Sequence, residues 1–177
     1  MLHHFARSLR LAVLGAGALA LPAAAQSSAT PSRTIAIFPV QLDFSNANAV
    51  FGADSALGTV ASDTLRAAME RAGAYRLADS RALDDTLRAM RERSEPCVGD
   101  PCALRLARAI GADVALTTRL SKISTPVWYL DAHLLDVATG KTLTSEEFEL
   151  KGRAPQMVPK GMEVVARRVS AAAASHP

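Results

Sequence analysis

The amino-terminal segment constrains the fold most, because it divides the chain into an export signal and a domain that must fold without it. The first ten residues carry two arginines and no acidic residue, and an uninterrupted apolar or small stretch follows over residues 11–21. Pro22 then breaks any helix, and residues 23–25 are the small alanines that signal peptidase accepts. These are the three parts of a secretory signal. We therefore expect a signal peptide over residues 1–25, cleavage before Gln26 and a periplasmic mature protein.

A membrane anchor fits the same segment poorly. A spanning helix needs about 20 apolar residues, whereas this stretch ends early at a proline, and no cysteine follows closely to carry a lipid. Removing the signal also removes two arginines, so the net charge falls from +3 to +1. Because this balance is near neutral and no basic cluster stands among aromatic residues, we expect no nucleic-acid partner and no transmembrane segment after cleavage.

The remaining chain has a length typical of one domain. We expect a disordered spacer over 26–33, a single domain over 34–172 and a frayed tail from 173 to 177. Apolar periodicity and turn residues predict the element order β-α-β-α-α-β-β-β-α, which indicates a mixed α/β (α+β) domain with helices packed on a mixed sheet. The strands are expected over 34–40, 75–78, 114–120, 127–137 and 141–150. The helices are expected before Gly73, over 80–90, from Asp100-Pro101 to Gly111 with the acid as N-cap, and from near Pro159, with residues 170–177 beyond its end.

Cys97 and Cys102 are the two cysteines of the chain. In an oxidising compartment they most simply form one structural disulfide. A redox pair usually has two intervening residues rather than four, and a zinc site would need further ligands that the mature chain, with only His133 and His176, does not supply. We therefore predict a structural disulfide and no metal site.

Several stretches resemble a pattern found in bacterial envelope proteins. They are the strand IAIFPV, the segment CVGDPC at 97–102, the following ALRLARAIGADVALTTRL, and WYLDAHLLDVATGKTL at 128–143. This pattern is similar to the TolB amino-terminal domain, to relatives of the curli secretion component CsgG and to a periplasmic family of unknown function. The resemblance covers about residues 34–150 and implies a role in envelope assembly and protein contact. It supplies no catalytic residues, and the sequence contains neither the β-propeller of TolB nor the lipid-attached cysteine of CsgG.

One group of polar residues is a candidate site. Alternation along a predicted strand places Tyr129, Asp131 and His133 on one face, and we expect Thr117 and Arg119 of the neighbouring strand on the same side. An Asp–His pair spaced this way can orient an imidazole for base catalysis or bind a metal. No motif ties a nucleophile or third ligand to it, and open sheet faces commonly carry such residues. We therefore predict a partner-facing or solvent-facing surface. The opposite face is predicted to be buried through Trp128, Leu130, Ala132 and Leu134.

A second candidate is the loop predicted over residues 41–54, in which Asp43, Asn46 and Phe51 could form a ligand site. No nucleophile-elbow, zinc-protease or phosphate-loop motif occurs in the sequence. The main interpretation is a periplasmic, non-enzymatic protein-interaction or envelope-assembly module that uses no cofactor and binds an unidentified periplasmic or envelope protein. The alternative is a small-molecule-binding protein or minor hydrolase that uses this loop and the strand acids. Three glutamates, at 146, 147 and 149, indicate a solvated edge strand.

Overall fold

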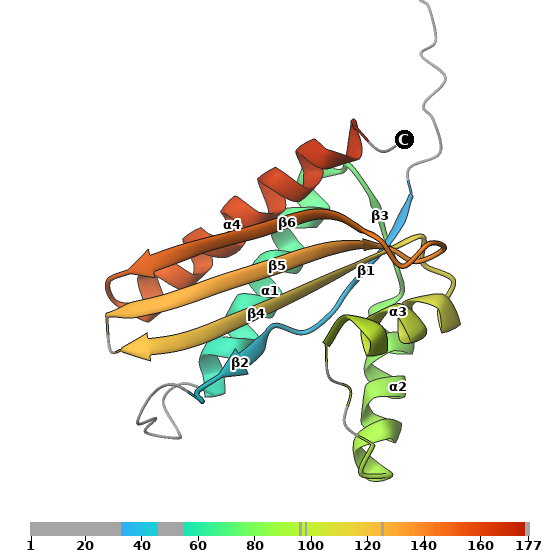
Figure 1. The fold of residues 1–177 in the computed structure, drawn as a ribbon, viewed down its shortest axis with the longest axis horizontal. Helices are drawn as coiled ribbons and strands as arrows, with labels where there is room; N and C mark the ends of the chain where they lie inside the picture. Colours follow the sequence, from blue (N-terminus) through green and yellow to red (C-terminus); the bar gives the residue numbers. More distant parts are fainter. Residues whose placement is uncertain (1–32, 46–54, 96, 98, 125, 176–177) are drawn as a thin grey trace, which may run out of the picture.

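The computed structural model describes residues 33–45, 55–95, 97, 99–124 and 126–175, and within them it confirms a mixed α/β domain (Figure 1). The strands in this part of the chain are β1 (Thr34–Ile37), β2 (Gln41–Asp43), β3 (Arg76–Leu77), β4 (Val114–Ser124), β5 (Val127–Asp136) and β6 (Thr142–Lys151). The helices are α1 (Ser55–Ala72), α2 (Ser80–Glu92), α3 (Gly99–Ala109) and α4 (Ala154–Ala173).

All six strands belong to one mixed sheet, whose main order is β3-β1-β4-β5-β6. β1 lies parallel to both β3 and β4, whereas β4, β5 and β6 form an antiparallel meander. The short strand β2 also pairs with β4 in parallel, further along the same strand, where Gln41 is the partner of Arg119. Gly140 ends the tight turn between β5 and β6. Its φ of 71° is a backbone conformation that favours glycine.

The two faces of the sheet are covered to different extents. Helices α1 and α4 pack on one face over a large apolar core that contains Trp128, Leu130 and Leu134. Helices α2 and α3 pack on the other face over a smaller core that includes Ala115 and Leu135. Figure 1 shows α2 and α3 gathered toward the β1 end of the sheet. The alternation predicted for β5 is present, because Trp128 is 2% exposed and its neighbour Tyr129 is 40% exposed.

Several predicted boundaries were wrong. β1 ends at Ile37 rather than at residue 40, and β4 continues to Ser124 rather than ending at residue 120. Residues 41–43 form β2 rather than the start of a loop, because the backbone pairs with β4 while Leu42 packs against the main core. Helix α4 begins at Ala154, ahead of Pro159, which lies inside the helix. Pro159 is the sixth helical residue, so the carbonyl of Pro155 loses its intrahelical donor. The helix continues through this position because its neighbours Val158 and Met162 are buried in the main core. The same helix continues through Ala173, so residues 170–173, which were expected beyond its end, are helical.

The start of α3 also differs from the prediction. The helix begins at Gly99, so Asp100 lies inside the first turn and is not the N-cap. Its carboxylate is directed to side chains of the sheet. The predicted signal peptide, together with Asn46 and Phe51, lies outside the described residues. Among the helices that the structure does describe, none combines the length and apolar character needed to cross a bilayer.

Candidate functional site

The candidate site lies on the side of the sheet that α2 and α3 cover only in part. Residues that are partners across neighbouring strands point to the same face, and Thr117 pairs with His133 while Arg119 pairs with Asp131. The structure therefore brings all five residues of the predicted strand surface together. We call this surface the open face, and define it by Gln41, Asp43, Thr117, Arg119, Ser121, Tyr129, Asp131, His133, Ser145, Glu147 and Glu149.

His133 is held between two carboxylates on this face. Its Nδ1 lies 2.8 Å from Oδ2 of Asp100, and its Nε2 lies 3.1 Å from Oδ1 of Asp131. The hydroxyl of Thr117 donates to Oδ1 of Asp100 over 2.9 Å. Both ring nitrogens of the imidazole are thus engaged. Neither can take a proton from a substrate unless one of these contacts breaks first, because a general base must reach the proton it removes.

A cavity of about 170 Å³ adjoins this cluster, and the residues around it come from β2, α3, β4 and β5. This volume is below the range of roughly 300–1,000 Å³ that is usual for small-molecule sites. Asp43, which sequence analysis assigned to a ligand loop, is not one of the lining residues. The cavity is lined by Gln41, Gly99, Asp100, Thr117, Thr118, Arg119, Asp131 and His133.

Asp43 instead ends β2 and is the strand partner of Ser121. The backbone N–H of Ser45 donates to Oδ1 of Asp43 over 2.9 Å. This bond is the main reason why the pKa of Asp43 lies below its usual value, with smaller contributions from the Ser45 hydroxyl, the charge of Arg119 and the Ser121 hydroxyl. Asp43 is therefore a carboxylate that stays ionised at neutral pH on the open face.

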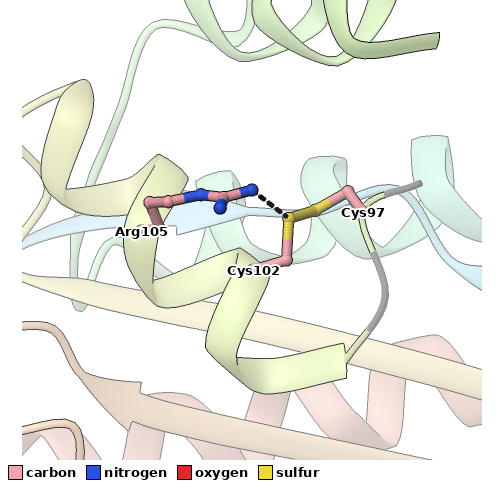
Figure 2. Close-up of a disulfide and its surroundings, with 3 residues drawn as sticks. All are labelled: Cys97, Cys102 and Arg105. Atoms are coloured by element: carbon pink, nitrogen blue, oxygen red, sulfur yellow. Dashed lines mark hydrogen bonds between the residues drawn. A yellow bond between two sulfur atoms is a disulfide. The ribbon is translucent and has the colours of Figure 1, made fainter. Parts of the chain in front are cut away.

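The start of α3 is fixed by a disulfide between Cys97 and Cys102, whose Cα atoms are 5.4 Å apart (Figure 2). Cys102 is buried in the smaller core, and Nη2 of Arg105 lies 3.8 Å from its sulfur. The short loop that the disulfide closes contains Asp100. The cross-link therefore restricts the position of the carboxylate that contacts His133 and Thr117.

Among the members of this site that the sequence analysis did not identify are Asp100 and Gln41. Gln41 was placed in a loop, and Asp100 was interpreted as a helix cap because it precedes a proline. The position of Asp100 between two cysteines was a usable signal, since a disulfide there fixes a short loop against its surroundings. Glu146, by contrast, takes part in an ion pair with Arg168 of α4, on the face opposite the open face.

Two known structures, both of LpoB domains, show the same fold. The C-terminal domain of LpoB from Salmonella enterica has a TM-score of 0.51 and 20% identity, covering 71% of this chain and 87% of that one. The corresponding domain from Escherichia coli has a TM-score of 0.50 and 18% identity, with the same coverage. TolB from Acinetobacter baumannii has a TM-score of 0.46 and 14% identity, covering 80% of this chain and 28% of that one.

No curated protein matches the chain in sequence. A family model does match it, over residues 33–169, which span the described strands and nearly all of α4. The chain therefore belongs to the family DUF3280, described as "Protein of unknown function (DUF2380)".

Proposed function

We propose that this chain is a non-enzymatic protein-interaction module of the periplasm, and that the open face contacts its partner. The observation that carries the proposal is the composition of this uncovered face. Tyr129 is its exposed aromatic residue, and charged and hydroxyl side chains surround it on β4, β5 and β6. An aromatic anchor within a polar rim is typical of protein contact surfaces.

The arrangement of His133 supports binding over catalysis. An imidazole with both nitrogens engaged by carboxylates is fixed in place, and a fixed polar surface loses little side-chain entropy when a partner binds. The adjoining cavity is small and open to the polar face. The similarity of the sequence to TolB-like and CsgG-like envelope proteins supports the periplasmic setting, as does the predicted export signal.

Photo-crosslinking tests this proposal. A photoreactive phenylalanine analogue at position 129 of the exported chain should give a discrete adduct with an envelope protein in intact cells. The same analogue in place of Val60, an exposed apolar residue of α1, provides the matched control and should not give that adduct. Once the partner is purified, Tyr129→Ala should weaken binding by about 1 kcal/mol or more, and Val60→Ala should not.

The result that contradicts the proposal is equally specific. The purified protein would turn over a substrate, and His133→Ala or Asp131→Ala would abolish that activity while the melting temperature stays unchanged. The site would then be catalytic, and the small-molecule alternative would replace the interaction module.

A further inference from the structure

Strand β6 forms one end of the sheet, and its outer edge is unpaired within the part of the chain described here. It pairs with β5 along its inner edge, and no backbone hydrogen bond of the described residues reaches its outer edge. The strand is ten residues long, whereas proteins usually shorten or cover such edges to prevent pairing with another chain. A long unpaired edge is the feature that a peptide uses when it adds a strand to a sheet.

The register identifies the backbone groups that point outward. The N–H of Gly152 donates to the carbonyl of Pro126 over 2.8 Å, which makes these two residues a hydrogen-bonded pair. In an antiparallel ladder every second pair is of this type, and the register between β5 and β6 is continuous from this point to Leu134. The even-numbered residues of β6 therefore bond to β5. The outward N–H and C=O groups belong to Ser145, Glu147, Glu149 and Lys151.

The charges along this edge select the kind of strand that can pair with it. The side chains of Ser145, Glu147 and Glu149 are exposed on the open face. Among the ion pairs between described residues, none uses Glu147, and Glu149 takes part in one, with the highly exposed Lys151 at 3.0 Å. An exposed pair of this kind contributes about 0–1 kcal/mol, so both glutamates remain able to attract a cation.

The same charges oppose pairing with a second copy of the chain. Two β6 strands in an antiparallel arrangement centred near Glu147 place a glutamate opposite, or diagonally next to, another glutamate. Like charges in directly opposite positions destabilise a strand pair. A strand with lysine or arginine at alternate positions has the opposite effect, because its cations lie on the open face beside Glu147 and Glu149.

We propose that the outer edge of β6 receives an extended segment of a partner protein in which lysine or arginine alternates with apolar residues. The cations pair with the two glutamates, and the apolar side chains lie on the other face, beside Phe148. This inference rests on the proposed function, that the chain binds a protein. It adds the place of the contact and the chemistry of the partner.

The experiment uses the exported chain and two short synthetic peptides, one alternating lysine with valine and one alternating glutamate with valine. Amide exchange measured by NMR should slow at the outward amides of Glu147 and Glu149 when the lysine peptide is added, and not with the glutamate peptide. Ser145→Pro removes one outward N–H and keeps every charge and every bond to β5, so it should weaken peptide binding roughly fivefold or more. Ser145→Ala keeps the N–H and is the matched control, expected to bind normally.

A second variant keeps the test decisive if the proline substitution unfolds the strand. Glu147→Lys preserves the backbone edge and reverses one charge. It should therefore weaken binding of the lysine peptide and strengthen binding of the glutamate peptide. The inference is overturned if the lysine peptide slows no amide of β6, or if β6 instead pairs with a second copy, seen as a dimer that Ser145→Pro dissociates. If Tyr129→Ala weakens binding of the natural partner while Ser145→Pro does not, the edge of β6 is excluded as the contact and the proposed function stands. If neither variant affects the partner, the proposed function fails as well.

Discussion

Removing the carboxylate of Asp100 should destabilise the domain by a predictable amount. This side chain accepts a hydrogen bond from Thr117 and pairs with His133, over 2.9 and 2.8 Å. Asp100 and His133 are about one third exposed, at 33% and 32%, so each contact should contribute close to the average net value of about 1 kcal/mol. Asp100 also lies in the first turn of α3, where a negative charge adds roughly 0.3–1 kcal/mol. We expect Asp100→Ala to lower the free energy of unfolding by about 2–3 kcal/mol.

Urea denaturation of four chains measures how much of this effect comes from the imidazole. They are the wild type, Asp100→Ala, His133→Ala and the double variant, and their cycle gives the coupling energy of the pair. We expect a coupling of about 1 kcal/mol. Asp84→Ala, at an exposed position of α2, is the matched control and should change stability by no more than about 0.5 kcal/mol. A coupling energy indistinguishable from zero would refute the conclusion that the contact between Asp100 and His133 stabilises the packing of α3 on the sheet.

Three further predictions concern the core, the disulfide and acid stability. Trp128→Ala should lower the free energy of unfolding, measured by urea denaturation, by roughly 3–5 kcal/mol, because this side chain is buried in the main core. A decrease of less than about 1 kcal/mol would contradict that packing. Reduction of the disulfide should lower the free energy of unfolding by about 2 kcal/mol, because the unfolded chain then regains the entropy that closing the short loop removes. Calorimetry with and without reductant measures the corresponding decrease in melting temperature. The pKa of Asp136 is lowered chiefly by the backbone N–H of Thr139, then by the Thr139 hydroxyl and by Arg33. The resulting stability is present at neutral pH and lost as the pH falls from the usual aspartate range through this lowered value, so Asp136→Asn should flatten the acid limb of a stability–pH curve.

Local patterns predicted the elements that local interactions determine. Alternation assigned the two faces of β5 correctly, because side chains on a strand have a strict period of two. The helix expected from residue 80 begins there as α2, and the carboxylate of Asp79 accepts a hydrogen bond from the backbone N–H of Arg81 at its start. Gly111 ends α3 with a φ of 70°. Each of these features is determined by residues within a few positions along the chain.

The features that sequence reasoning did not find depend on distant residues. Strand β2 has three residues, too few for an alternating pattern, and it forms because β4, far along the chain, presents a free stretch of edge. The role of Asp100 depends on Thr117 and His133, which are 17 and 33 positions away. A single sequence carries no record of such pairs, so Asp100 was interpreted through its nearest neighbour, a proline.

The position of Asp100 explains why one face of the sheet is open. On that face, Ala115 pairs with Leu135, and both are buried in the smaller core with α3. The next pair on the same face is Thr117 with His133, where the strands change from apolar to polar side chains. The carboxylate of Asp100 contacts both residues of this pair. The carboxylate therefore provides hydrogen-bond partners for these polar groups where the apolar core ends, and the start of α3 can pack against the sheet there. The rest of this face is not covered by α3 and is available to water or to a partner.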